Sequence, residues 1–419
     1  MINIPYINLY IFLVGLGATW KFEFGGDLYA TDLLLAGSLL YFLERARRFL
    51  LHGLIGILLL LGALWLVNLI VTDVYRGTPF EDWSRGWAKI AFLLIDFCGI
   101  IVLTKLRYER IIWFVAGTTC ALLLQALFFP NQYQSTESES WKFGIGVACT
   151  TFAALFGASA LARRLLGPVG EFIPLALLGI VSLALDARSL FGTAIAAVAF
   201  GITKKMISLS PQLQARIKPA VFSVLLVGGL VVSQGLIATY EIAADGGWLG
   251  EEAKRKYETQ ASGSIHLLIG GRAESLVSTT AIGDSPIVGH GSWAKDVAYV
   301  ALLINILESK GLNVAGDPYL SPLIPTHSHL FGAWVEAGIM GGVFWIVVLV
   351  IAIAAFYRCL KREDVPGTLT AYILISLVWV ILFSPLGAQA RFQTSAMICV
   401  ALSVLLPPRR TPLRLASLK

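Results

Sequence analysis

The chain contains 419 residues, of which 57% are hydrophobic and only 14% are charged, and its mean hydropathy is +0.76. These values exclude an ordinary soluble globular protein and predict an integral membrane protein. The net charge of +6 does not require a nucleic-acid partner, because basic loops beside anionic lipid account for it. The five cysteines lie in or beside apolar segments, so we expect neither a disulfide framework nor a thiolate metal site.

Apolar runs long enough to cross about 30 Å of hydrocarbon recur along the chain, and their continuous rather than alternating pattern predicts an all-α fold. We expect about twelve membrane helices, at residues 5–20, 28–44, 53–73, 87–104, 111–129, 144–162, 168–185, 189–203, 219–239, 330–356, 369–385 and 392–406. The first run lacks a basic leader and is interpreted as a membrane helix. The run at 189–203 is short and rich in Ala and Gly, so a re-entrant or short buried helix is the alternative there.

Lysine and arginine collect in every second loop, as they do in the cytoplasmic loops of membrane proteins. More than half of the 32 basic residues fall on this side, namely Arg45, Arg47, Arg48, Lys105, Arg107, Arg110, Arg163, Arg164, Lys204, Lys205, Arg216, Lys218, Arg358, Lys361, Arg362, Arg409, Arg410, Arg414 and Lys419. The alternation places both termini in the cytoplasm and requires residues 189–203 to cross. We divide the chain into membrane helices (1–239), a large, mostly helical external loop (240–329), and membrane helices with a cytoplasmic tail (330–419).

The external loop is where we expect chemistry, because the other predicted loops are short. It contains Gly270-Gly271-Arg272-Ala273-Glu274, followed by Pro286-Ile287-Val288-Gly289-His290-Gly291. Glycine lets the backbone approach a ligand closely, and a guanidinium group suits bidentate binding of phosphate oxygens. Arg272 is therefore a candidate anion ligand and Glu274 a secondary site candidate. An exposed ion pair between these two residues is the structural alternative.

Two histidines stand where the external loop meets the next predicted helix. His327 and His329 would lie at the membrane surface, and histidine is the side chain best suited to act as a base near neutral pH. Glu336 follows about two helical turns later, an expensive place for an unpaired carboxylate. It is interpreted either as a site residue or as a hydrogen-bond partner between helices.

Arg188 stands at the outer end of a predicted helix, where a cation is costly unless it meets an anion or water. Its alternatives are a structural ion pair with Asp186 or contact with lipid headgroups. Arg391, just before the last predicted helix, is a further secondary candidate. The chain lacks the His-Glu-x-x-His and Gly-x-x-x-x-Gly-Lys-Ser/Thr motifs, so we expect neither a metal nor a cofactor.

In this order the motifs resemble the O-antigen ligase and O-antigen polymerase superfamily, in which a His-Ser or His-Asn pair precedes a Glu-x-Gly-x-x-Gly helix after a large periplasmic loop. The matching segments, spread over residues 180–345, are His327-Ser328 with Leu330, Glu336-x-Gly338-x-x-Gly341, Gly271-Arg272-x-Glu274, Pro286-x-x-Gly289-x-Gly291 and Arg188-Ser189. Two positions depart from the family pattern. Leu185-Asp186-Ala187 replaces a polar Thr/Ser run, and His329 replaces a serine or a hydrophobic residue.

The resemblance implies a glycosyltransferase-C-like fold in a bacterial inner membrane, with the active site facing the periplasm. It implies an O-antigen ligase that transfers glycan from undecaprenyl diphosphate to lipid A-core oligosaccharide, without a metal and with inversion of the anomeric carbon. In that reaction His327 would accept the proton of the attacking hydroxyl, and Arg188 and Arg272 would bind the diphosphate. The implied partners are the glycan donor, the lipid A-core acceptor and the surrounding membrane lipids.

Three other functions remain open from the sequence. An O-antigen polymerase would use the same carrier lipid and the same motifs. A protein oligosaccharyltransferase of this superfamily is less expected, because those enzymes generally carry an extra C-terminal region. A secondary transporter is the alternative from a different class, suggested by Asp32, Asp96 and Glu171 within or beside predicted membrane helices.

Overall fold

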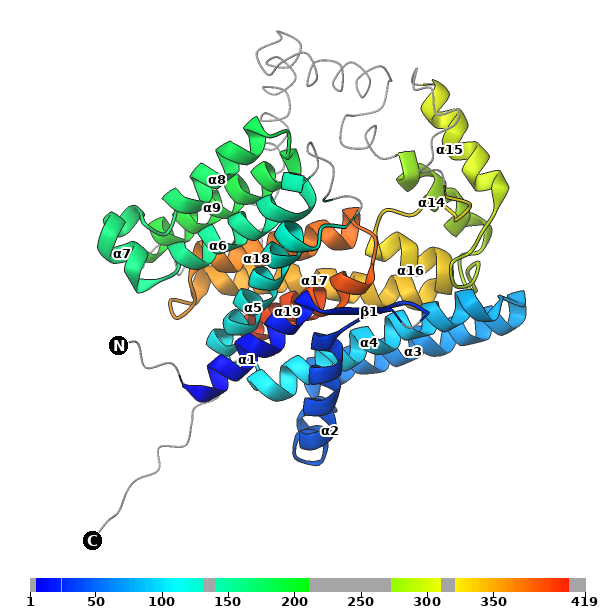
Figure 1. Cartoon of the computed structure of the whole chain (residues 1–419), viewed down its shortest axis with the longest axis horizontal. Coiled ribbons are helices and arrows are strands. Elements are labelled where there is room, and N and C mark those ends of the chain that lie inside the picture. The colour runs from blue at the N-terminus through cyan, green and yellow to red at the C-terminus, as the bar shows by residue number, and fades with distance from the viewer. Residues whose placement is uncertain are drawn as a thin grey trace.

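The computed structural model describes residues 5–23, 25–131, 134, 140–210, 273–309 and 321–406, and the structural statements below concern these residues. They form an almost entirely helical assembly (Figure 1). Within the described residues, five helices are long and apolar enough to cross a membrane, namely α3 (Gly53–Arg76), α4 (Phe80–Thr104), α5 (Tyr108–Phe128), α9 (Arg188–Ser208) and α17 (Ile339–Lys361). This is the architecture of an all-α membrane protein.

The other elements are shorter or bent. A pair of helical segments, Trp141–Gly157 and Ala160–Val169, meets at 78° and provides a sixth crossing if it is one span. The remaining helices are α1 (Tyr6–Leu16), α2 (Ala30–Leu50), α8 (Ile173–Ala184), α14 (Ala273–Asp284), α15 (Val297–Ser309), α16 (His329–Ala337), α18 (Gly367–Phe383) and α19 (Ala388–Leu405). Strands β1 (Lys21–Glu23) and β2 (Asp27–Tyr29) form an antiparallel hairpin between α1 and α2.

Most of the predicted membrane helices correspond to helices in the structure. The doubtful segment at 189–203 belongs to α9, a continuous helix that is long enough to cross. The prediction at 219–239 lies outside the described residues. α4 begins at Phe80 rather than at residue 87, because Glu81 and Asp82 suit the first turn of a helix and extend it beyond the apolar run. The total of twelve crossings stays a prediction.

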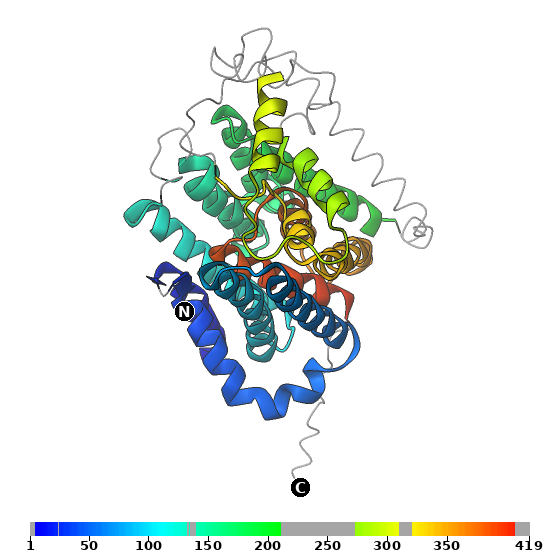
Figure 2. The same ribbon diagram turned by 90° about the vertical axis from the view of Figure 1, so that its right-hand side faces the viewer.

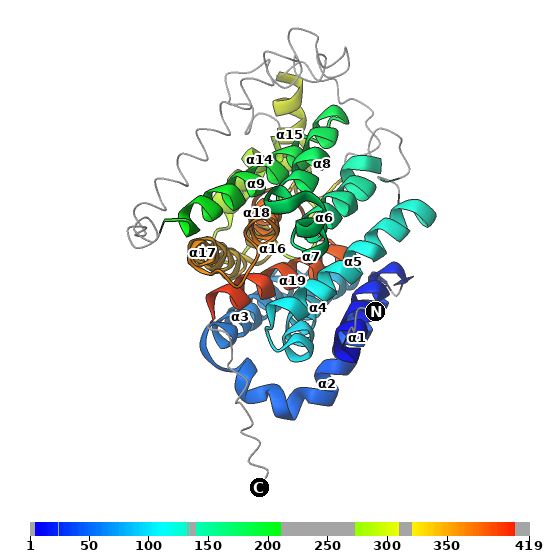
Figure 3. The same ribbon diagram turned by 90° about the vertical axis from the view of Figure 1, so that its left-hand side faces the viewer.

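α19 lies at the centre of the bundle. It packs against α4, α5, α17 and α18, and most of its side chains are buried. The buried alanines and serines of α19 allow neighbouring helices to approach closely. α2 is the opposite case, because its second half stands away from the other helices (Figures 2 and 3). The core of the membrane domain is thus built around the C-terminal helices.

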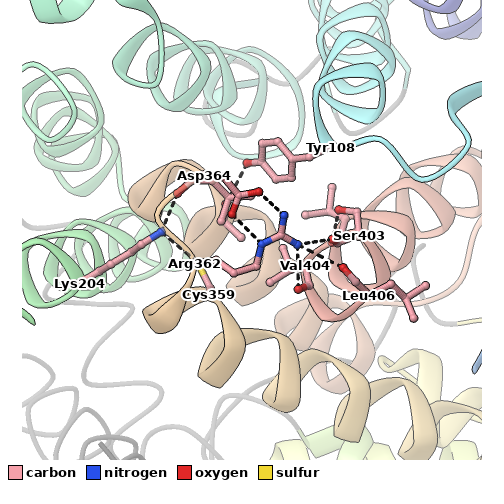
Figure 4. Close-up of polar contacts among 11 residues, drawn as sticks. Tyr108, Lys204, Cys359, Arg362, Asp364, Ser403, Val404 and Leu406 are labelled. Carbon is pink, nitrogen blue, oxygen red and sulfur yellow. Dashed lines mark hydrogen bonds and ion pairs between the residues drawn. The ribbon is translucent and has the colours of Figure 1, made fainter. Parts of the chain in front are cut away.

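Segments that the charge pattern assigns to one side meet at one end of the bundle (Figure 4). Arg362 donates to carbonyl oxygens at the end of α19, including that of Ser403 at 2.7 Å, and pairs with Asp364. The hydrogen bond from Arg362 lowers the pKa of Asp364 below its usual range. Lys204 of α9 donates to the Val365 carbonyl at 2.6 Å. Two of the predicted basic loops, those of Lys204 and of Arg362, therefore lie together at the end of α19, as a common membrane side requires.

Glu171 belongs to the same end of the bundle. Its Oε1 accepts a hydrogen bond of 3.0 Å from the Thr368 N–H, in the first turn of α18. The first N–H groups of a helix have no partner within the helix, and a carboxylate there also complements the helix dipole. Glu171 therefore has a structural function at a helix start, which removes one of the three residues that suggested a transporter.

Candidate functional site

The helix predicted at residues 330–356 is broken at Gly338, where α16 ends and α17 begins. Gly338 has φ +61° and ψ −153°, a conformation that essentially only glycine adopts. A Cβ at this position would collide with the carbonyl oxygen of Ile287 in the external loop. The single-helix prediction was therefore wrong, because the loop backbone packs directly against the helix backbone and forces a turn.

The break frees backbone groups of α16, and the external loop and α3 satisfy them. The carbonyl oxygens of Val335, Glu336 and Ala337 accept hydrogen bonds from the His290 N–H (2.7 Å), the Gly291 N–H (3.0 Å) and the Asn68 side chain, respectively. In return the Ile339 N–H, at the start of α17, donates to the Ile287 carbonyl at 3.2 Å. A broken membrane helix is tolerated only where other groups replace its lost hydrogen bonds in this way.

The outer end of α3 holds the same turn of the loop, residues 286–291. Thr72 donates its hydroxyl to the Val288 carbonyl at 2.5 Å, and Arg76 donates to the Gly289 carbonyl at 2.9 Å. Asp73 accepts from the N–H and the hydroxyl of Ser292, both at 2.7 Å. Side chains of a membrane helix thus fix the loop backbone in one position.

The glycines of this turn serve packing within the protein. Gly289 has φ +87°, and a Cβ there would lie 2.5 Å from the Gly338 nitrogen. Gly291 has φ +95°, and a Cβ there would lie 2.7 Å from the Thr78 hydroxyl. The close neighbours of these two glycines are other residues of this chain, so packing within the protein accounts for glycine at both positions.

Beyond the turn, α14, α15 and residues 321–328 form a lobe that packs on α16 (Figure 1). We call it the external lobe, because it belongs to the loop that the sequence predicts to be external. A separate small hydrophobic core joins them, made by Val277, Ala281, Tyr299, Ile324 and Val335. Tyr299 donates to Asp284 at 2.6 Å, and burial together with this hydrogen bond raises the pKa of Tyr299 to about 12. The lobe is therefore packed against the membrane domain.

Ser328 and His329 shape the start of α16. The Ser328 hydroxyl caps the helix by accepting from the Phe331 N–H at 3.1 Å, and it donates to the Ile381 carbonyl at 2.7 Å. The His329 ring is 1% exposed, with Nδ1 2.6 Å from the Ser384 carbonyl oxygen and Nε2 3.3 Å from the Thr394 hydroxyl. Both ring nitrogens of His329 are engaged in holding α16 to its neighbours.

A cavity of about 330 Å³ lies where the external lobe meets α16 and the outer part of α4. This is at the lower end of the size range of small-ligand sites. His327, Glu274, Lys89 and Glu336 contribute polar side chains to its lining. His327 is exposed, whereas His329, which also lines the cavity, is buried. The structure therefore separates the two histidines, and His327 is the one that a ligand can reach.

Lys89 and Glu336 face each other in the cavity wall. Lys89 Nζ lies 2.5 Å from Glu336 Oε2, and the side chains are 15% and 16% exposed. The Lys89 ammonium also lies 5.9 Å from the centre of the Trp293 ring, within the range of a cation–π contact. Glu336 is thus an ion-pair partner between two helices, and it also lines the candidate site.

The three predicted arginines are not all at this cavity. Arg188 Nε lies 3.1 Å from Asp186 Oδ1, the ion pair that the sequence offered as the structural alternative, and Arg188 is not among the cavity-lining residues. Arg391 is 5% exposed and pairs with Asp32 away from the cavity lining. Arg272 lies outside the described residues, directly before the first residue of α14.

Sequence reasoning missed several residues that build the site. Lys89 falls inside a predicted membrane helix, and a lysine there was itself a signal for a partner. Asn68, Thr72 and Arg76 recur at every fourth position, so they share one helix face. A polar face at the outer end of an apolar helix could have indicated a docking surface for the external loop.

Comparison with known proteins adds no family to these observations. The chain matches no protein-family model and no curated protein sequence.

Proposed function

We propose that this chain is a membrane glycosyltransferase of the O-antigen ligase type. In this proposal it transfers a glycan from undecaprenyl diphosphate to a hydroxyl group of lipid A-core oligosaccharide at the periplasmic face of a bacterial inner membrane. The observation that carries the proposal is the exposed His327 in a cavity between membrane helices and an external lobe. A reaction between two lipid-linked molecules suits such a place, because both can reach it from the membrane.

In the proposed reaction His327 is the general base. The acceptor hydroxyl gives its proton to the His327 ring while its oxygen forms a bond to the anomeric carbon. The bond from that carbon to the phosphate oxygen breaks, and the diphosphate leaves with the electron pair. Direct displacement inverts the anomeric carbon, and a positioned base typically contributes about 10² to 10⁴ to the rate.

The departing diphosphate needs stabilisation of its charge more than it needs a proton, and fixed cations provide this. One cation is supported by its position, because Lys89 lines the cavity. Arg272 lies outside the described residues and is proposed because it stands two residues before Glu274, which lines the cavity. Arg188 is proposed on the family resemblance alone. A carboxylate such as Glu336 beside Lys89 would hold the ammonium in place until a phosphate oxygen replaces it.

The test is a strain that lacks this protein and is complemented with variants. We expect His327→Ala and Arg272→Ala to be made at normal levels, to leave the lipid A-core without long glycan, and to accumulate carrier-linked polymer. His52→Ala is the matched control, because His52 is exposed and precedes α3 outside the cavity. Full-length lipopolysaccharide ladders in both site variants would contradict the proposal.

The same strain separates the ligase from the polymerase. A polymerase would use the same carrier lipid and could use the same base. Loss of a ligase leaves polymer on the carrier, whereas loss of a polymerase leaves a core that bears a single repeat. The second outcome would keep the site assignment and change the acceptor from lipid A-core to another carrier-linked glycan.

A further inference from the structure

A second cluster of charged groups lies inside the membrane domain, outside the cavity lining. It consists of Asp32 in the first turn of α2, Asp96 in the middle of α4 and Arg391 in α19. The two aspartates are 0% exposed and Arg391 is 5% exposed. Arg391 Nη2 lies 3.0 Å from Asp32 Oδ2. None of these residues contributes to the proposed transfer reaction.

The hydrogen bonds of this cluster are incomplete in a specific way. Asp32 Oδ2 accepts from the Tyr29 N–H at 2.7 Å and from Arg391. In the part of the chain that the structure describes, Asp32 Oδ1 and both oxygens of Asp96 are buried without a donor. α2 and α4 pack in direct contact beside these carboxyls, because a Cβ on Gly99, three residues after Asp96, would lie 2.8 Å from the Cβ of Leu35, three residues after Asp32. Residues three apart share a helix face, so the two carboxyls lie on the facing sides of the two helices. Two ionised carboxylates there cannot form a hydrogen bond with each other, because each can only accept.

Charge leads to the same conclusion. Arg391 pairs with Asp32, and its Cζ also lies 5.2 Å from the centre of the Phe92 ring, one helical turn before Asp96 in α4. Two ionised carboxylates and one guanidinium would leave a net negative charge in a site without access to water, which is a costly arrangement. Two carboxyl groups that share a site avoid this cost by holding one proton between them.

We infer that Asp32 and Asp96 form a buried proton-binding site, with the proton on Asp96 and a hydrogen bond from Asp96 to Asp32 Oδ1. Asp32 is the ionised member because it already accepts two donors, whereas Asp96 accepts none. The triad with Arg391 is then electrically neutral. The proton on Asp96 makes this carboxyl a hydrogen-bond donor to Asp32 Oδ1, which otherwise has no donor among the described residues.

The bound proton fastens α2 to the bundle. The second half of α2 stands apart from the other helices, so its first half must hold it in place (Figures 2 and 3). Asp32 in the first turn connects α2 to α19 through Arg391, and in this proposal to α4 through the proton on Asp96, where the two helices are in contact. Asp32 and Asp96, which suggested an ion pathway in the sequence, thus hold α2 against its neighbouring helices.

Infrared difference spectroscopy tests this inference on the purified wild-type protein at neutral pH. We expect the carbonyl stretch of a protonated carboxyl group in apolar surroundings, which shifts when H₂O is replaced by D₂O. Asp96→Asn should remove it. Asp82→Asn is the control and should retain it, because Asp82 is paired with Lys295 at 2.7 Å. A wild-type spectrum without this band would overturn the inference without any variant.

Thermal unfolding gives a second, independent readout. Asp96→Asn should keep the melting temperature close to that of the wild type, because an amide can donate to Asp32 as the protonated acid does. Asp32→Asn should lower it by several degrees, because Arg391 would then be buried without its counter-ion. Equal losses in both variants would overturn the inference. A second contradicting result would be that sodium raises the melting temperature of the wild type but not that of Asp96→Asn. A metal cation would then occupy the place of the proton.

Discussion

Lys89 of α4 and Glu336 of α16 form an ion pair of 2.5 Å in the wall of the cavity, and each is largely shielded from solvent. Glu336 also accepts the Gly291 N–H through its backbone carbonyl, so the same residue holds the external turn and lines the site. The Lys89–Glu336 pair therefore joins two membrane helices beside the external turn and also lines the cavity. Its removal should affect both the stability of the protein and the binding of an anionic ligand.

We expect Lys89→Met to destabilise the protein by about 3–5 kcal/mol, because it leaves the Glu336 carboxylate shielded and unpaired. The double variant Lys89→Met/Glu336→Gln should recover much of that loss, which a double-mutant cycle of unfolding free energies would show. Glu336→Gln alone should increase the affinity for a lipid diphosphate, because it frees the ammonium. Additive losses in the double variant would contradict a direct ion pair.

Gly338→Ala should be among the most damaging small substitutions in the chain. It combines a positive φ with a collision against the Ile287 carbonyl, so we expect a loss of more than about 3 kcal/mol. Gly192→Ala in α9 is the control, because no neighbour lies within 4 Å of its added Cβ; a gain of up to about 1 kcal/mol is expected there. Unfolding in detergent measures both, and equal stabilities would rule out the strained break.

Asp73→Asn should loosen the external lobe. Asp73 accepts from the Ser292 N–H, the Ser292 hydroxyl and the Trp87 indole, and an amide cannot accept at both of its polar atoms. We expect a loss of about 1–3 kcal/mol and faster proteolysis within residues 285–309. Asp82→Asn is the control, because it removes the ion pair between Asp82 and Lys295 of the same lobe. The Lys295 side chain is 51% exposed, so this loss should lower the unfolding free energy by at most about 1 kcal/mol. Similar proteolysis of both variants would argue against Asp73 as the anchor.

Arg362→Met should weaken the opposite end of the bundle. The guanidinium donates to the Ser403 carbonyl at 2.7 Å and the Val404 carbonyl at 3.1 Å, and both acceptors would lose this donor. We expect a lower melting temperature and faster hydrogen exchange at the end of α19. Arg358→Met, on the last turns of α17, is the control. An unchanged exchange rate at residues 400–405 would show that α19 does not depend on Arg362.

Hydropathy predicted the helices because lipid imposes the same requirement on every crossing segment. It did not predict the break at Gly338, since glycine is common in membrane helices and the group that collides with a Cβ there, the Ile287 carbonyl, comes from the external loop. The charge alternation requires residues 189–203 to cross, and α9 is a continuous helix long enough to do so. Lys204, near its end, lies beside the segment of Arg362 (Figure 4).

The candidate site was predictable only in part. The two histidines are two residues apart, and no physical feature of the sequence favours His327 over His329 as the base. Their roles separate because His329 is the first residue of α16 and is buried against Ser384, whereas His327 precedes the Ser328 cap and is exposed. Pairings across the fold, such as Lys89 with Glu336 and Arg391 with Asp32, depend on helix packing that no local pattern records.

The most direct test of the proposed function is glycan transfer by the purified protein in proteoliposomes that contain an undecaprenyl-diphosphate glycan and a lipid A-core acceptor. With wild-type protein we predict transfer, and with His327→Ala a rate lower by about 10² to 10⁴ at unchanged donor binding. His52→Ala should transfer at the wild-type rate. Transfer by His327→Ala at the rate of the wild type would contradict the assignment of His327 as the base and the account built on it.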